Sequence, residues 1–104
     1  MDKKYAAQEA ITHSMMGSLG LKLIEEKEGF IRASMPVNDN TSQPFGVLCG
    51  GASLAFAEII AGYGSYLCCP EGFIPVGSSV SGNHVSSVRK APDVLVYAEA
   101  TALH

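Results

Sequence analysis

The chain has 104 residues, of which 47% are hydrophobic and 16% are charged, and its formal net charge is −3. This composition describes a mildly acidic globular protein, and it argues against disorder and against nucleic acid as a partner. Residues 1–104 are enough for a single domain and no more. A domain of this size buries only about two-thirds of its unfolded surface. We therefore expect self-association, as a dimer or a tetramer, to add to its core.

The first half of the chain predicts a helix followed by a hairpin. Apolar side chains recur at helical spacing over residues 3–16, and Gly17 is the expected C-cap of this helix. Residues 21–27 and 30–37 are predicted to be strands joined by a tight turn at Glu28-Gly29, because the second segment alternates apolar and polar residues. A polar loop follows, as its composition indicates.

Residues 52–69 predict a long helix that other structure covers. The segment is too long for a strand, and its apolar residues occupy every face. Gly50-Gly51 opens this helix with backbone that a ligand can approach, so the free N–H groups at the positive end of the helix face whatever binds there. Pro70 ends the helix. Its single charge, Glu58, argues against a membrane span, where a central carboxylate costs about 2.5 to 3.5 kcal/mol.

The last part of the chain predicts two further strands. Residues 74–89 place small residues between apolar ones, which suits a strand under a close-packed helix. Pro92-Asp93 makes a turn, and residues 94–103 again alternate apolar and polar side chains. The resulting order is helix, strand, strand, buried helix, strand, strand. It predicts an α+β fold in which an antiparallel sheet curves round one central helix.

The cysteines, the histidines and the first residues predict a cytoplasmic protein without a metal. Three cysteines are an odd number, and the Cys68-Cys69 pair is poorly placed for a structural disulfide, so we expect reduced thiols. The histidines at 13, 84 and 104 lack metal-ligand spacing, which argues against zinc. The first residues are polar and alanine-rich, unlike a signal peptide. We expect no metal, no redox cofactor and no membrane partner.

Glu58 is the strongest candidate for chemistry. A carboxylate buried among apolar neighbours such as Phe56, Ile60 and Tyr63 has to be paired or neutralised, and such environments are typical of a catalytic acid or base. The alternative is a buried glutamate satisfied by structural hydrogen bonds. Gly62 lies one helical turn further along the same face, and its small size would leave a groove beside the carboxylate.

The stretch before the long helix carries a motif. It reads Gln43-Pro44-Phe45-Gly46-Val47-Leu48-Cys49-Gly50-Gly51 and, after six further residues, Glu58. This resembles Gln-Pro-x-Gly-x-x-His-Gly-Gly-x-x-x-x-x-x-Glu of the hotdog-fold acyl-CoA thioesterases of the phenylacetyl-CoA and dihydroxynaphthoyl-CoA type, with Cys49 where the family has histidine. The likeness extends through Asn83-His84-Val85 to Leu103-His104. Family members continue beyond that point, so the resemblance implies a hotdog fold that lacks its C-terminal strands.

The resemblance also implies a role for each matched residue. In the family, the first N–H of the Gly-Gly pair holds the thioester oxygen, the glutamate activates water or attacks the carbonyl itself, and the glutamine helps to place the reacting group. Gly50, Glu58 and Gln43 take these catalytic roles, and Cys49 occupies the histidine position. The acyl and CoA parts of the substrate would meet a second set of positions: Gly77, His84, Val85, Ser86 and Ser87. Active sites of the family lie at the boundary between subunits.

Three functions remain in competition at this point. The first is hydrolysis of an acyl-CoA, possibly an aryl-CoA, to a free acid and CoA. The second is a catalytically impaired hotdog remnant that binds acyl-CoA as a homo-oligomer, which Cys49 and the early end of the chain favour. Cys49 itself fits a small apolar residue better than a nucleophile, because no base lies beside it in the sequence. A hydratase would need a histidine near Asp39, and the loop has none.

Overall fold

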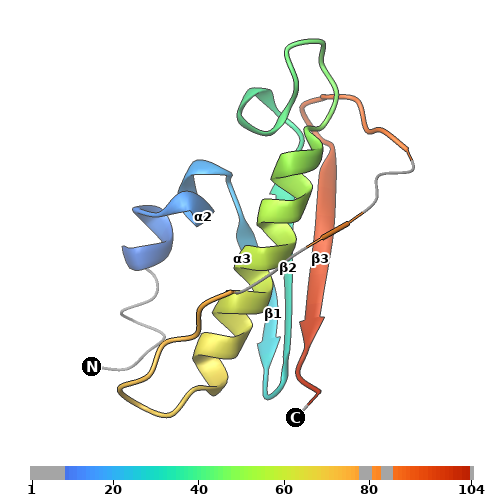
Figure 1. Cartoon of the computed structure of the whole chain (residues 1–104). Coiled ribbons are helices and arrows are strands. Elements are labelled where there is room, and N and C mark those ends of the chain that lie inside the picture. Colours follow the sequence, from blue (N-terminus) through green and yellow to red (C-terminus); the bar gives the residue numbers. More distant parts are fainter. Residues whose placement is uncertain (1–8, 78–80, 83–85, 104) are drawn as a thin grey trace.

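The computed structural model describes residues 9–77, 81–82 and 86–103. A long helix lies along one face of an antiparallel sheet, and a short helix packs beside it (Figure 1). The sheet has three strands in the order β1-β2-β3. The elements are α2 (Met15–Ser18), β1 (Lys22–Lys27), β2 (Phe30–Pro36), the 3₁₀ turn η1 (Asp39–Thr41), α3 (Gly50–Cys68) and β3 (Leu95–Thr101). The predicted α+β arrangement of an antiparallel sheet around a central helix is therefore confirmed.

The hairpin forms as predicted. β1 and β2 pair antiparallel around a two-residue turn, with Lys27 opposite Phe30. Gly29 in this turn has a φ of +74°, which glycine adopts without a steric penalty. The inward side of β2 and the residue that follows the strand are fully buried and carry the predicted alternating residues: Ile31, Ala33, Met35 and Val37. β1 is an edge strand with four charged residues out of six, and its register shifts at a bulge between Leu23 and Glu25.

β3 completes the sheet. It pairs with β2 along its whole length, from Phe30 opposite Thr101 to Pro36 opposite Leu95. Its residues alternate between half-buried and exposed, as the sequence predicted, and the half-buried ones pack toward α3. The turn at Pro92-Asp93 is also present. In the part of the chain that the structure describes, the other edge of β3 has no paired strand.

The long helix is present, but the sheet buries only one of its faces. Ala52, Phe56 and Ile60 point into the core against the inner side of the sheet. Glu58 and Gly62 lie on the opposite, exposed face. The prediction of a helix buried on all sides is therefore wrong. The residues of the exposed face include alanine and glycine, which count as apolar in composition but have little apolar surface to bury. Among the described residues, no helix is long and apolar enough to cross a membrane.

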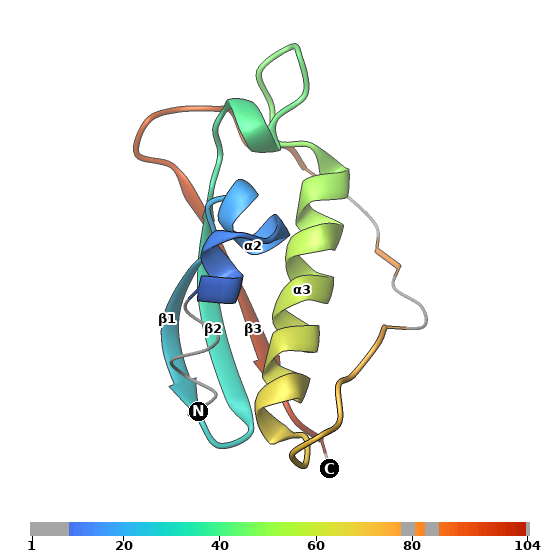
Figure 2. The ribbon, with the colours of Figure 1, turned by 90° about the vertical axis from the view of Figure 1, so that its left-hand side faces the viewer.

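The predicted strand over residues 74–89 does not form in the described part of this segment. After α3 the chain turns back, and the described part of the returning segment lies on the side of the helix away from the sheet (Figure 2). None of the strands that the structure describes lies beside it to supply hydrogen-bond partners, and a strand exists only as part of a ladder. Phe73, Ile74 and Val76 are consequently exposed. Residues 78–80 and 83–85 of the predicted strand lie outside the described residues.

The N-terminal helix differs from its prediction in length and in its end. Residues 9–12 are helical, while residues 1–8 lie outside the described part. The chain then breaks at Ser14, whose hydroxyl accepts a hydrogen bond from the Met16 N–H and so caps a new helix, α2. The glycine that follows the helix end is Gly20, with a φ of +73°, rather than the predicted Gly17. A capping serine in the interior of the pattern explains the break.

Candidate active site

The motif residues before α3 form a tight turn. The Gln43 N–H donates to the Val47 carbonyl at 2.7 Å, and the Gly46 N–H donates to the Gln43 carbonyl at 2.9 Å. Gly46 has a φ of +87°, so this turn favours glycine at that position of the motif. The turn closes on an isolated bridge between Ser42 and Leu48. These hydrogen bonds hold the backbone of Gln43 at the base of a short loop.

Thr41 joins this turn to the start of α3. Its hydroxyl is buried and donates to the Pro36 carbonyl at 2.7 Å, while its own carbonyl accepts the Cys49 N–H at 2.8 Å. Thr41 and Asn38 also form a reciprocal capping box around η1. Composition indicated only a solvated polar loop here. The spacing Asn-x-x-Thr was the signal that could have identified Thr41 as the residue that fixes the helix entry.

Gln43 and Cys49 contact each other directly. The side-chain amide Nε2 of Gln43 donates to the Sγ atom of Cys49 at 3.6 Å, and both residues are half-buried. Cys49 is the N-cap residue of α3, but its sulfur makes no capping bond to the helix. The sulfur is therefore available as an acceptor for the glutamine amide. The side chain at the position that the motif gives to histidine is thus in contact with the Gln43 amide.

Gly50 presents a free donor at the N-terminus of α3. The first four N–H groups of an α-helix have no partner within the helix. Here the Ala52 and Ser53 N–H groups donate to the Cys49 carbonyl, whereas the Gly50 N–H has no acceptor among the described residues. The positive end of the helix macrodipole adds to this donor. The position is suited to hold an oxygen that gains negative charge.

Glu58 lies on the exposed face of α3, not in the core as predicted. Residues two positions apart differ by about 200° around a helix, so Glu58 points away from the sheet when Phe56 and Ile60 point toward it. In the described part of the chain its carboxylate has no hydrogen-bond or ion-pair partner. Gly62 and Ser65 follow on the same face and are exposed as well. A Cβ atom built on Gly62 would meet nothing within 4 Å among the described residues, so the groove expected there beside the carboxylate stays a prediction.

Glu58 does not lie next to Gly50 within one chain. The two residues are eight positions apart on α3, which corresponds to about 12 Å along the helix axis. A reacting carbonyl must be about 3 Å from both its oxyanion donor and the attacking atom, and a general base must be within hydrogen-bond reach of the attacking water. The chain therefore brings together Gln43, Cys49 and Gly50 at the helix N-terminus and places Glu58 more than two turns away.

The predicted substrate contacts divide into two groups. Gly77 lies on the segment that crosses α3 and contacts the Glu58 side chain. Ser86 and Ser87 are exposed and lead into Val88, whose carbonyl accepts the Leu48 N–H of the motif loop at 2.8 Å. The positions of His84 and Val85 lie outside the described residues.

Two titratable groups near the helix have shifted pKa values. The Lys90 ammonium donates to the Asp39 carboxylate at 2.7 Å, and this hydrogen bond, with the charge of Lys90, lowers the pKa of Asp39. Partial burial raises the pKa of Tyr63 on α3, and the nearby Glu26 acts in the same direction. At neutral pH, Asp39 is therefore a charged partner of Lys90, and Tyr63 is a neutral phenol.

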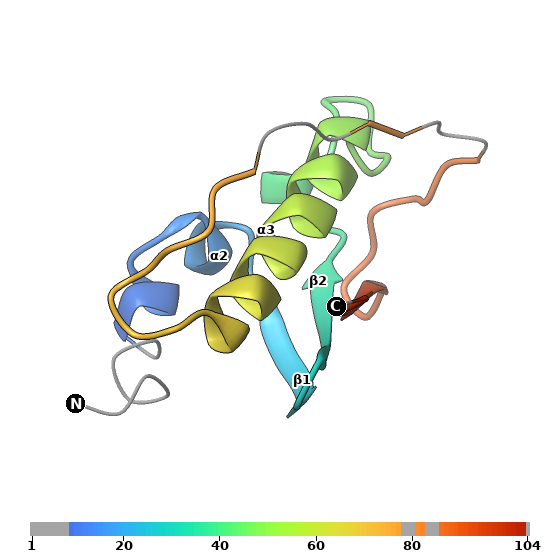
Figure 3. The same cartoon turned by 60° about the horizontal axis from the view of Figure 1, so that its bottom comes forward.

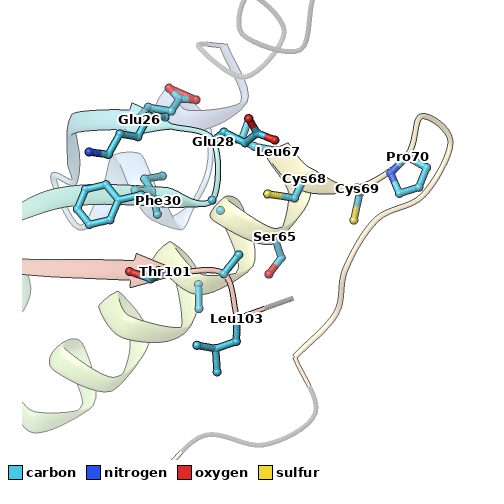
Figure 4. A pocket seen from close by; sticks show the side chains of 17 residues that line it. Glu26, Glu28, Phe30, Ser65, Leu67, Cys68, Cys69, Pro70, Thr101 and Leu103 are labelled. Atoms are coloured by element: carbon cyan, nitrogen blue, oxygen red, sulfur yellow. The ribbon is translucent and has the colours of Figure 1, made fainter.

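A cleft of about 930 Å³ lies at the other end of α3. The C-terminal turn of the helix, the β1–β2 turn and the end of β3 form its walls, as the side chains in Figure 4 show. Leu67 in its wall is seventeen residues from Gly50, about 25 Å along the helix. None of the motif residues lines this cleft. It is separate from the cluster at the helix N-terminus.

Comparison with known proteins places this arrangement in a family. Residues 45–104 match the model of the thioesterase superfamily. The chain belongs to this superfamily. It is 39% identical over 77 residues to the 1,4-dihydroxy-2-naphthoyl-CoA hydrolase of Escherichia coli. This aligned stretch covers 74% of this chain and 57% of the relative. It is 34% identical over 90 residues to a proofreading thioesterase of Cronobacter turicensis. Here the aligned stretch covers 83% of this chain and 66% of the relative.

Solved thioesterase structures share the fold. A thioesterase of Haemophilus influenzae superposes with a TM-score of 0.84 at 36% identity, over 100% of this chain and 71% of that one. A variant thioesterase of Pseudomonas aeruginosa gives the same TM-score at 32% identity, over 100% and 73%. The predicted hotdog fold and family resemblance are confirmed. The chain spans 57% of the Escherichia coli relative, 66% of the Cronobacter turicensis relative and 65% of a Haemophilus influenzae protein that is 40% identical over 93 residues.

Proposed function

We propose that this thioesterase superfamily member hydrolyses the thioester of an acyl-CoA, with aryl-CoA esters as the favoured class, to a free acid and CoA. The observation that supports this most is the N-terminus of α3. There the Gly50 N–H has no acceptor among the described residues, and the Gln43 amide contacts the sulfur of Cys49, the residue before Gly50. The similarity to the dihydroxynaphthoyl-CoA hydrolase of Escherichia coli supports the aryl class.

The reaction follows from these groups. The thioester oxygen accepts the Gly50 N–H, which stabilises the negative charge that develops when the carbonyl carbon is attacked. Gln43 contacts the reacting group beside it. In one route Glu58 takes a proton from a water molecule whose oxygen attacks the carbonyl carbon, the carbon–sulfur bond breaks, and the proton passes to the departing CoA thiolate. In the other route the Glu58 carboxylate attacks the carbonyl itself, the carbon–sulfur bond breaks to leave an acyl–Glu58 anhydride, the CoA thiolate takes a proton from water, and a second water hydrolyses the anhydride to the free acid. CoA takes part as the leaving group of the substrate, and the scheme uses no metal or redox cofactor.

The site is built from two copies of the chain. The separation of about 12 Å along α3 prevents Gly50 and Glu58 of one chain from meeting the same carbonyl. Both residues face outward, so a second copy can supply what the first lacks. In this arrangement Gly50 and Gln43 of one subunit act together with Glu58 of the partner subunit. The exposed face of α3 then becomes part of the subunit boundary.

A substrate panel tests the activity. The purified protein is incubated with aryl-CoA and aliphatic acyl-CoA esters, and the released thiol is followed with a chromogenic reagent. We expect turnover of at least one aryl-CoA, abolished in Glu58→Gln. Binding of the ester in calorimetry without release of thiol would instead support the acyl-CoA-binding homo-oligomer, and neither binding nor turnover would contradict both.

Mixed oligomers test whether two copies share a site. Glu58→Gln and Gly50→Pro chains are each expected to be nearly inactive alone. When they are co-expressed in equal amounts and assort randomly, each site has a chance of about one quarter of combining an intact Gly50 with an intact Glu58. We therefore expect the mixture to regain about a quarter of wild-type activity. Activity no higher than that of the separate variants would place both groups in one chain.

A further inference from the structure

Gly77 lies against the carboxylate of Glu58. A Cβ atom built on Gly77 would be 2.6 Å from Oε1 and 3.5 Å from Cδ of Glu58, so the Gly77 backbone is in contact with the carboxylate end of that side chain. A second glycine of the same segment, Gly82, makes a similarly close approach to Leu54, one turn earlier on α3. Gly77 and Gly82 therefore both lie close to α3, and Figure 3 shows the described part of this segment on the side of the helix away from the sheet.

The backbone conformation does not explain why glycine occupies position 77. Four glycines of the described chain have a positive φ, and Gly77 is not one of them. Its neighbour Val76 is 84% exposed, so dense packing around the segment does not exclude a side chain either. The group that a side chain would meet is the Glu58 carboxylate. Glycine at position 77 therefore leaves the Glu58 carboxylate the space that a side chain would otherwise take.

We propose that Gly77 is a positioning residue for Glu58. Its backbone limits one side of the space in which the carboxylate can move. This contact restricts the rotamers of a long side chain whose carboxylate has no hydrogen-bond or ion-pair partner among the described residues. The proposal rests on the function proposed above, in which Glu58 must approach a carbonyl bound at Gly50 of the partner subunit. A carboxylate that moves by about 1 Å can cost on the order of 100-fold in rate.

Gly77→Ala is expected to move the carboxylate without unfolding the protein. The atoms that a methyl group meets belong to the flexible end of the Glu58 side chain, which can rotate toward solvent. We expect kcat for the best substrate to fall about 10- to 100-fold, with a smaller change in KM and an unchanged Tm. Val76→Ala, at the adjacent exposed position, is the matched control and should retain wild-type kinetics.

Two further measurements separate positioning from other causes. In a Glu58→Gln background, Gly77→Ala should cause no further loss, because the group through which it acts is already absent. In the substrate-free protein, the carboxyl ¹³C resonance of Glu58 should move in Gly77→Ala and stay in place in Val76→Ala. An unmoved resonance overturns the positioning role even if the protein hydrolyses nothing, whereas a moved resonance in a protein without turnover contradicts only the proposed function. Full activity of Gly77→Ala also overturns it.

Discussion

Glu58→Gln is expected to lower kcat for the best acyl-CoA substrate by roughly 10²- to 10⁴-fold, the usual contribution of a general base. Glutamine keeps the shape of the side chain but cannot accept a proton or attack a carbonyl. Glu58 is exposed and has no partner in the described part of the chain, so its replacement should change stability by no more than about 0.5 kcal/mol. Thiol release measures the loss, and thermal unfolding shows that the fold is kept.

A second glutamate controls for the change in charge. Glu71 is exposed and lies just beyond the end of α3, so Glu71→Gln removes the same charge at a place that the proposed site does not use. It should behave as the wild type. If Glu58→Gln remained folded and turned over substrate at the wild-type rate, Glu58 would be neither base nor nucleophile.

Gly50→Pro is expected to lower kcat by roughly 10²- to 10³-fold, because proline deletes the N–H that holds the developing oxyanion. The structure makes this deletion unusually clean. Gly50 is the first residue of α3, a position where helices accept proline. Cys49 before it has φ −74° and ψ 128°, the extended conformation that a residue preceding proline prefers. The helix should therefore start as before, without its first donor.

Gly50→Ala is the matched control, because it adds a side chain and keeps the N–H. We expect it to retain much more activity than Gly50→Pro, with both variants showing the circular dichroism spectrum of the wild type. Equal losses in the two variants would show that crowding, rather than the missing donor, causes the effect. The Gly50 N–H would then have no part in stabilising the oxyanion.

The local parts of the fold could be predicted from the sequence. The hairpin depends on alternation within β2 and on a Glu-Gly turn, and both are visible in consecutive residues. The length of α3 follows in the same way from its glycine pair and from Pro70. Which faces of this helix are buried could not be predicted in the same way. Ala57 and Ala61 count as apolar in composition but are exposed in the structure. Small residues are compatible with either environment.

The non-local parts could not be predicted. The pattern of residues 74–89 is that of a strand, but strand formation depends on a neighbouring ladder, which the sequence of the segment does not report. In the same way, motif spacing predicted that Gln43, Cys49 and Gly50 gather at one helix end. The same spacing puts Glu58 eight residues, or about 12 Å, beyond Gly50 along a helix, but it did not show that Glu58 lies on the exposed face. The contact between Glu58 and Gly77 joins two elements that only the fold brings together.

The two edges of the sheet differ in how readily they accept another strand. β1 carries four charges and a bulge, two devices that discourage edge-to-edge pairing. β3 carries one charge, Glu99, which is already engaged by Arg32 on the neighbouring strand, and it exposes Leu95 and Tyr97. The two edges of the sheet are therefore not equivalent, and a further strand can pair more readily with β3 than with β1. Sheet extension and aggregation of misassembled chains should both begin at β3, and a charge placed there would improve solubility more than the same charge placed at β1.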